Sequence, residues 1–313
     1  MRVLITGASG LIGRAVAERL RSSHEVVVLC RASGRSAAAG LQVHVGDLLD
    51  PASLRAAMLG VAAVIHCAGA TEATVGLERM VETNHAGTRN VVRAALAAGV
   101  RRFVHASSSV TVGGPGDGEI YDEDDVFAWG YLENAYHDSK RAAEDEVLAA
   151  VRDGLDAVIL NPVQVCAAGD SERKNLRLVR KVSERGGWLY PVGGISVTCL
   201  DPVAEAFVAA LERGERGTRY LLAGPNLTYG ELLGAVARRA GTRPPRLPVG
   251  RRSALGIELA SRLLSTLLGR PLGLPRGAAR GFEHYAYYRS DRAARALGYR
   301  PPSLDEAISQ LIG

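Results

Sequence analysis

Short apolar, mostly β-branched runs alternate with alanine-rich segments of helical periodicity over the first half of the chain. The apolar runs predict strands at 2–6, 25–30, 42–45, 63–67, 103–106 and 157–160. The segments between them predict helices at 12–21, 52–59, 77–98 and 136–152. Several runs are apolar throughout, as in strands of a parallel sheet buried on both faces. The sequence therefore predicts an α/β fold with a doubly wound parallel (Rossmann) sheet, whose ligands bind at the carboxyl ends of the strands.

The pattern becomes looser after residue 160. It predicts a helix at 173–185, a strand at 196–200, a helix at 202–213, a strand at 219–222 and mostly helix beyond. We expect residues 1–165 to form a dinucleotide-binding domain to which residues 196–222 return. Residues 166–195 and 223–313 are then expected to form a smaller, mostly helical, substrate-binding lobe.

Composition excludes several classes of protein. The 313 residues are 47% hydrophobic, and no apolar run reaches the roughly 18 residues of a membrane helix. The 38 basic residues exceed the 33 acidic ones by five, but the arginines are scattered and predict no nucleic-acid tract. The start, MRVLITG, enters a strand directly and lacks the apolar region of a signal peptide, so we expect a cytoplasmic protein.

Two residue types stand out by their number. The four cysteines lie far apart without paired spacing, so neither a metal site nor a disulfide framework is expected: Cys30, Cys67, Cys166 and Cys199. Each adjoins an apolar run, which favours small buried strand residues. The chain has three lysines, Lys140, Lys174 and Lys181, so a lysine within a chemical motif stands out.

A glycine pattern, T-G-x-x-G-x-x-G, follows the first predicted strand at residues 6–13 and leads into a helix. Gly7 permits a tight turn, Gly10 lets the backbone approach a pyrophosphate, and Gly13 allows close helix–strand packing. Unpaired N–H groups and partial positive charge at the helix N-terminus favour the diphosphate. The predicted dinucleotide contacts in this loop are Gly7, Ser9, Gly10, Leu11, Ile12 and Gly13.

The residues after the second strand bear on which nucleotide binds. NAD-selective sites place a carboxylate there, whereas this chain has Arg31 and Arg35. A guanidinium can pair with a 2′-phosphate, so NADP(H) is favoured over NAD(H), although both arginines could also be ordinary solvated loop residues. Asp47 and Leu48, closing the third strand, are placed to meet the adenine, but an acidic turn residue explains Asp47 equally well.

A Y-x-x-x-K motif, Tyr136 to Lys140, begins the predicted helix 136–152 and puts a phenol and an ammonium on one face. The ammonium favours the phenolate and makes tyrosine a better acid/base near neutral pH. Upstream, residues 107–109 form a serine triplet at the carboxyl end of a strand, where a hydroxyl can bind a substrate oxygen as charge develops. Serines that end strands are also common turn residues.

Together these motifs resemble the extended short-chain dehydrogenase/reductase family. The matching segments are TGASGLIG at 6–13, GDLLD at 46–50, VIHCAGA at 64–70, NHAGTRNV at 84–91, FVHASSSVTVGG at 103–114, YHDSK at 136–140, LNPVQV at 160–165 and CLDPVAEA at 199–206. The resemblance implies a Rossmann fold and a nicotinamide cofactor. It also implies a homodimer through helices near 90–98 and 142–150.

The resemblance also implies residue roles. Tyr136 is the general acid/base, Lys140 its activator and a ribose ligand, and Ser109 the hydrogen-bond donor to the substrate. Asn84 is a structural or proton-relay residue. The remaining cofactor-binding positions implied by the family are Ala68, Gly69, Pro162 and Val165.

Departures from family patterns guide the choice of branch. Signatures of sugar epimerases and 4,6-dehydratases are missing at 110–114 and 160–162, and the C-terminal segment 279–308 looks more like dihydroflavonol-reductase-like and 3β-hydroxysteroid-dehydrogenase-like enzymes. We expect an NADP-dependent carbonyl reductase or alcohol dehydrogenase acting on a small molecule of low polarity. The alternatives are a nucleotide-sugar epimerase with tightly bound NAD(P) and a non-catalytic NADP-binding regulator.

Features on the substrate side leave several interpretations open. Arg173, Lys174 and Arg216 are possible contacts for the second diphosphate of a sugar nucleotide. An apolar helical stripe at 253–274 could roof a hydrophobic pocket, pack in the core or, less favoured, lie on a membrane surface, because Glu258 and Arg262 interrupt it. Trp129 and Tyr131 could line the pocket but are more typical of core residues.

Overall fold

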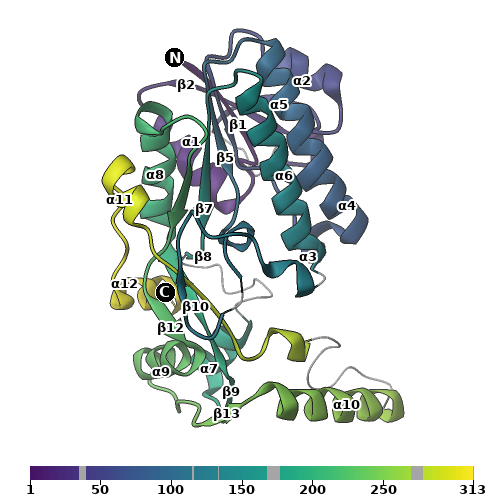
Figure 1. Cartoon of the computed structure of the whole chain (residues 1–313), viewed down its shortest axis with the longest axis vertical. Coiled ribbons are helices and arrows are strands. Elements are labelled where there is room, and N and C mark those ends of the chain that lie inside the picture. Colours follow the sequence, from purple (N-terminus) through teal and green to yellow (C-terminus); the bar gives the residue numbers. More distant parts are fainter. Residues whose placement is uncertain (35–39, 115, 133, 168–176, 269–277, 313) are drawn as a thin grey trace.

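The computed structural model describes residues 1–34, 40–114, 116–132, 134–167, 177–268 and 278–312 (Figure 1). Seven parallel strands form the main sheet in the order β11-β7-β5-β4-β1-β2-β3. Their bounds are β1 Arg2–Thr6, β2 Glu25–Cys30, β3 Gln42–Val45, β4 Ala63–His66, β5 Arg102–Ala106, β7 Ala157–Pro162 and β11 Arg219–Leu222. The order reverses direction between β1 and β4, as in a doubly wound sheet. The predicted Rossmann fold is confirmed.

Helices cover both faces of this sheet. Side chains on both faces of the strands are therefore buried, so most strands are apolar at successive positions. On β1, Val3 and Ile5 pack with helices α1 (Leu11–Leu20) and α8 (Leu200–Arg213). Leu4 points the other way. The helices of its face are α2 (Pro51–Ala57), α5 (Thr88–Ala97) and α6 (Ala135–Arg152). Two hydrophobic cores therefore sandwich the sheet.

The helix predicted at 77–98 consists of three parts. It begins as α4 (Leu77–Val81), just after the short α3 (Glu72–Val75), continues as a π-helical turn at Glu82–Gly87 and ends as α5. The π turn accommodates one residue more than an α-helical turn does. Hydrophobic periodicity predicted the helix but gave no sign of the extra residue.

A second lobe contains more strand than the sequence indicated. A smaller sheet has the order β12-β10-β14-β6, with β8 paired to β10, and a two-stranded sheet joins β13 and β9. The strands are β6 Ile120–Tyr121, β8 Gln164–Cys166, β9 Leu189–Pro191, β10 Gly193–Cys199, β12 Asn226–Thr228, β13 Leu247–Val249 and β14 His284–Tyr288. Most are two or three residues long, too short to produce a recognisable alternation.

The chain crosses between the main sheet and the smaller sheet more than once, and one crossing lies between β7 and β8. Pro162 ends β7 in the main sheet, and Gln164 begins β8 in the smaller sheet. Residues 196–199 of the strand predicted at 196–200 belong to β10, which pairs in the smaller sheet, and Leu200 begins α8. The strand predicted at 219–222 is β11 and joins the main sheet.

Helices complete the second lobe. A third hydrophobic core lies among α7 (Arg177–Arg185), α9 (Tyr229–Ala240) and α12 (Leu304–Ile312). Helix α11 (Asp291–Leu297) packs on α8, and α10 (Arg251–Leu268) extends from the lower end of the lobe (Figure 1). Short 3₁₀ turns occupy Ala32–Gly34, Ser109–Thr111, Trp129–Leu132 and Ala278–Gly281.

Candidate active site

The glycine loop between β1 and α1 has no room for side chains at two of its three glycines. Gly7 has φ of 75°, and a Cβ there would lie 2.5 Å from the backbone nitrogen of Ala68. A Cβ on Gly13 would lie 2.4 Å from the carbonyl oxygen of Gly7. The N-terminus of α1, capped by Gly10, has no side-chain cap and no acidic residue in its first turn. Its N–H groups therefore suit the diphosphate of a dinucleotide.

Hydrogen bonds across the strand ends fix the neighbouring loop. The Thr6 hydroxyl and His66 Nδ1 share a bond of 2.6 Å, and the backbone N–H of Ala68 donates to the same hydroxyl at 3.3 Å. On the other side of the ring, His66 Nε2 forms a hydrogen bond of 3.0 Å with the Thr88 hydroxyl. The Thr88 hydroxyl donates to the carbonyl of Asn84 at 2.6 Å. These bonds tie β1, β4 and the π turn together beside the glycine loop.

Asn84 is buried in the π turn, where its amide is fully engaged. Its Oδ1 accepts from the N–H of Ala70 at 2.7 Å, and its Nδ2 donates to the Ala70 carbonyl and to the Ser139 hydroxyl, both at 3.0 Å. Ser139 in turn donates to the carbonyl of Tyr136 at 2.9 Å. A Cβ on Gly69 would lie 3.6 Å from Asn84 Oδ1. Asn84 therefore holds the segment after β4 against the first turn of α6.

The first turns of α6 present the predicted acid/base pair. Asn134 caps the helix by accepting from the N–H of Tyr136 at 3.0 Å. Tyr136 is half-buried, and Lys140, one turn on, is 6% exposed and donates from Nζ to the Ala106 carbonyl at 2.7 Å. Burial lowers the pKa of Lys140 to about 8, although the Glu144 carboxylate opposes the shift. The ammonium thus lies at the carboxyl end of β5, at the edge of the sheet that carries the glycine loop.

Ser109 starts the 3₁₀ turn that follows β5, and a buried carboxylate anchors this turn to α6. Glu144 accepts from the Thr111 hydroxyl at 2.7 Å and from Asn161 Nδ2 at 2.5 Å, and it pairs with Arg219 Nε at 2.8 Å. Asn161 also donates to the Ser108 carbonyl at 3.2 Å. Residues far apart in the sequence thereby hold Ser109 in place relative to Tyr136 and Lys140.

Sequence reasoning missed this anchoring network. Two signals for it exist: Glu144 lies four residues after Lys140 on the same helix face, and Asn161 interrupts an otherwise apolar strand. Both side chains are completely buried. A buried carboxylate needs hydrogen-bond donors, and here Asn161 Nδ2, the Thr111 hydroxyl and Arg219 supply them.

Two histidines lie beneath the site and stay neutral. The rings of His66 and His105 stack with centroids 5.4 Å apart. Burial, helped by the Lys140 charge, lowers the pKa of His66 to about 3 and that of His105 well below its usual value. Burial also raises the pKa of Cys67 to about 12. None of the three side chains is set up to exchange protons near neutral pH.

The predicted nucleotide-selecting residues lie where their strands end. Arg31 is exposed directly after β2, and Arg35 lies outside the described residues. After β3, Asp47 accepts from the N–H of Leu49 at 2.9 Å and pairs with Arg79 at 3.3 Å. Leu48 accepts through its carbonyl from Asn90 at 3.1 Å and packs against Gly87. Asp47 thus has a structural role, and its contact with adenine stays a prediction.

Pro162 and Val165 lie on either side of the crossing between the sheets. Pro162 is the last residue of β7, at the edge that holds Ser109 and Lys140, and Val165 pairs with Thr198 in the smaller sheet. Both are buried. Their contacts with a cofactor also stay predictions.

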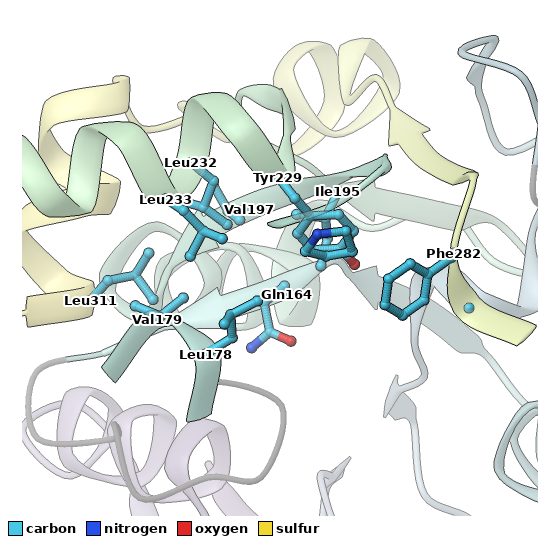
Figure 2. Close-up of a pocket in the computed structure, with 12 residues that line it drawn as sticks. Gln164, Leu178, Val179, Ile195, Val197, Tyr229, Leu232, Leu233, Phe282 and Leu311 are labelled. Carbon is cyan, nitrogen blue, oxygen red and sulfur yellow. The ribbon is translucent and has the colours of Figure 1, made fainter. Parts of the chain in front are cut away.

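A cavity of about 270 Å³ lies in the second lobe (Figure 2). Its walls are mostly apolar and come from α7, α9, α12 and β10; the lining residues are Gln164, Leu178, Val179, Pro191, Ile195, Val197, Tyr229, Leu232, Leu233, Gly281, Phe282 and Leu311. Ser109, Tyr136 and Lys140 do not line it. Among the lining residues, Gln164 is the nearest in sequence to Pro162, which ends β7 at the sheet edge that holds Ser109 and Lys140.

Other features expected near a substrate lie elsewhere. Trp129 is buried in a small cluster with Tyr288 and donates from Nε1 to the Val112 carbonyl at 3.1 Å, as expected of a core residue. The side chain of Tyr131 lies outside the described ones. Among the described side chains of α10, Leu255, Leu259, Leu263 and Leu264 point to solvent, so this part of the apolar stripe neither roofs the cavity nor packs in the core. That expectation was wrong, since helical periodicity does not tell which face is covered.

Curated relatives include enzymes of several activities. The chain is 32% identical over 268 residues to sterol demethylase protein B of Methylococcus capsulatus, covering 83% of this chain and 80% of that protein. It is 33% identical over 232 residues to 2-alkyl-3-oxoalkanoate reductase of Stenotrophomonas maltophilia, covering 68% and 66% respectively.

Solved structures share the whole fold. The crystal structure of gox2253 is 31% identical, with a TM-score of 0.85 over 99% of this chain and 96% of that one. PA4631, a nucleoside-diphosphate-sugar epimerase from Pseudomonas aeruginosa, is 25% identical with a TM-score of 0.75 over 99% and 96%. The NAD dependent epimerase/dehydratase family matches residues 3–223, which include every predicted catalytic residue. The chain is therefore a member of this family of extended short-chain dehydrogenases/reductases, whose members bind a nicotinamide cofactor.

Proposed function

We propose that the protein is an NADP(H)-dependent oxidoreductase that reduces a ketone, or oxidises a secondary alcohol, with Tyr136 as general acid/base. The observation that carries the proposal is the pair at the start of α6. Lys140 is buried and bonded to the last carbonyl of β5, and Tyr136 lies one turn before it on the same face. A regulator that only binds nucleotide could use the ammonium for the ribose but would need no phenol one turn before it.

Each residue has a role that follows from its chemistry. A bound nicotinamide supplies the hydride. The Tyr136 hydroxyl gives its proton to the carbonyl oxygen, and the Lys140 ammonium lowers the energy of the phenolate left behind. Ser109, held by the turn that Glu144 anchors, donates a hydrogen bond to the oxygen as negative charge develops. Because its pKa is about 8, Lys140 is mostly protonated at neutral pH.

The test of the acid/base role is Tyr136→Phe. We expect kcat for NADPH-dependent ketone reduction to fall by about 10²- to 10⁴-fold, while the Kd for NADPH, from fluorescence titration, stays within about twofold. Tyr285→Phe, on β14, is the matched control and should leave both quantities unchanged. Full activity in the Tyr136 variant would refute the mechanism.

The choice of NADP(H) rests on Arg31. Its guanidinium is exposed beyond the end of β2, where a carboxylate would bind the ribose of NAD. Losing a charge-assisted bond to the 2′-phosphate should weaken NADPH about tenfold or more in Arg31→Ala, with little change for NADH. Arg21→Ala, exposed at the end of α1, is the control. An equal loss of affinity for NADPH and NADH in Arg31→Ala would contradict the assignment of Arg31 to the 2′-phosphate.

The apolar cavity favours a substrate of low polarity whose tail enters the second lobe. The relative named 2-alkyl-3-oxoalkanoate reductase supports an alkyl ketone of this kind. We expect kcat/KM to rise with the alkyl length of a ketone series. Ile195→Phe, which narrows the cavity, should flatten that rise without affecting the shortest ketone. A flat series in the wild-type enzyme would contradict the role of the cavity.

A nucleotide-sugar epimerase is the second candidate, since the structure of one aligns along 99% of this chain. Such an enzyme needs cations for a second diphosphate. Arg216 already donates to the carbonyl of Val151, at the end of α6, and Arg173 and Lys174 lie outside the described residues. An epimerase would purify with tightly bound NAD(P) and interconvert a UDP-sugar without net turnover of the cofactor.

A further inference from the structure

Helix α10 turns its apolar side chains to solvent. Leu255, Leu259 and Leu263 recur every fourth residue and are 52%, 60% and 59% exposed. Ile257 and Leu264, seven residues apart, are 36% and 48% exposed and lie about 100° or more further round the helix, so the apolar residues cover about half of its circumference. We call these five residues the apolar face of α10. Figure 1 shows the helix extending away from the rest of the lobe.

The side of α10 that contacts the protein is small and polar. Ala254 and Ser261 are buried, Ser265 donates to the Ser261 carbonyl at 2.6 Å, and Glu258 accepts from the N–H of Ala279 at 3.3 Å. This reverses the usual arrangement of a helix on a globular protein. Glu258, which interrupts the apolar run in the sequence, lies on the inward side and leaves the apolar face unbroken.

Charge is concentrated in the same part of the chain. Residues 251–280 contain six of the 38 basic residues, all arginine, and one of the 33 acidic residues. Their net charge of +5 equals that of the whole chain, so the other residues hold 32 basic and 32 acidic side chains. Within α10 itself, Arg251, Arg252 and Arg262 are exposed.

We propose that α10 is a membrane-surface anchor, with its apolar face inserted at the headgroup–acyl boundary of an anionic lipid bilayer and its arginines at the lipid phosphates. An exposed apolar face with cationic neighbours is the chemistry that binds such a surface. The helix lies on the bilayer and does not cross it. Among the described residues there is no helix long and apolar enough to span a membrane.

A second copy of the chain fits the apolar face less well. Pairing two such helices about a two-fold axis would bring arginine-rich segments of equal charge together. The area is also small: a helix of 18 residues is about 27 Å long and about 10 Å wide, so it offers on the order of 300 Å², against about 800 Å² per partner in a stable interface. A lipid surface imposes neither limit.

The test compares two double variants of the full-length protein in vesicle co-sedimentation. Leu259→Glu/Leu263→Glu places two charges on the apolar face. Leu59→Glu/Val126→Glu makes the same charge change at side chains that are 71% and 83% exposed elsewhere. All these positions are solvent-exposed, so melting temperatures should match that of the wild type. Vesicles contain phosphatidylcholine either alone or mixed with phosphatidylglycerol.

We expect the wild type and the Leu59/Val126 variant to bind the mixed vesicles, with weaker binding at high salt and on phosphatidylcholine alone. The Leu259/Leu263 variant should bind roughly tenfold or more weakly. Absence of wild-type binding, or equal loss in both variants, would overturn the proposal. So would sedimentation showing a wild-type dimer that dissociates only in the Leu259/Leu263 variant, without vesicle binding, since a second copy would then cover the face.

Discussion

The buried ammonium of Lys140 lowers the stability of the folded protein at neutral pH. Its side chain is 6% exposed, and its pKa falls from 10.5 to about 8, mainly because burial disfavours the charged form. Since one pKa unit corresponds to about 1.4 kcal/mol, keeping the group protonated in the folded state costs about 3 kcal/mol relative to the unfolded chain. The carboxylate of Glu144 reduces this cost but does not remove it.

This cost depends on pH in a predictable direction. Below pH 8 Lys140 is protonated in both states, and the full penalty applies. Between pH 8 and 10.5 the folded protein loses the proton while the unfolded chain keeps it. The unfolded state then binds more protons, so the contribution of Lys140 to the free energy of unfolding rises with pH. Above 10.5 both states are neutral and the penalty is gone.

Lys140→Met removes the titration, so the two proteins should diverge as the pH rises. We expect the wild type to gain about 1.4 kcal/mol per pH unit over the variant once the pH exceeds 8. The assay is urea unfolding followed by circular dichroism between about pH 7 and pH 10. Other titrating groups are common to both proteins and largely cancel in the difference.

Lys181→Met is the control, because Lys181 is exposed on α7. Its difference from the wild type measures the effect of removing an exposed ammonium. A constant difference for Lys140→Met, or a wild type that loses stability relative to it, would refute the account of a buried charged lysine. The Met variant should also lack ketone reduction, which separates the stability effect from the chemistry.

Three further predictions concern the cofactor loop, the anchoring network and the assembly. Gly13→Ala puts a Cβ 2.4 Å from the Gly7 carbonyl and should weaken NADPH at least roughly tenfold by fluorescence titration; unchanged affinity would contradict the loop assignment. Glu144→Ala removes the carboxylate that pairs with Arg219 and accepts from Asn161, and should lower the free energy of unfolding by about 3–5 kcal/mol in urea, with Glu144→Gln losing less; an unchanged free energy of unfolding would contradict the role of the network. Sedimentation equilibrium should give twice the chain mass of 33.1 kDa, the homodimer that the family resemblance predicts, and a monomer would exclude it.

Local patterns were sufficient to predict the features that depend on neighbouring residues. The strand–glycine–helix order at 2–13 predicts the dinucleotide loop because a turn, a close approach and a helix start are all short-range requirements. The spacing of Tyr136 and Lys140 predicts a shared helix face for the same reason. Most strands of the main sheet were found because they are apolar runs bounded by turn residues, whereas β3, Gln42–Val45, alternates polar and apolar residues.

Features that depend on long-range contacts could not be found in this way. Glu144, Asn161 and Arg219 come from three elements, and nothing in the sequence indicates which donor meets which acceptor. The smaller sheet has strands of two or three residues, such as β6 and β8, which carry no periodicity. The sequence also could not show that α10 turns its apolar side chains to solvent, because amphipathic spacing is the same whichever side of a helix packs on the protein.

The π turn at Glu82–Gly87 amounts to a one-residue insertion within a helix. Each α-helical residue advances the side chain by about 100°, so deleting one residue there would rotate either α4 or the start of α5 by that angle relative to the other. Asn84 would then leave Ala70 and Ser139, or Met80 would leave the core. The extra residue thus lets one continuous helix meet two demands that a regular α-helix could not satisfy together. Homologous chains aligned through this segment should keep its length fixed even where its side chains vary.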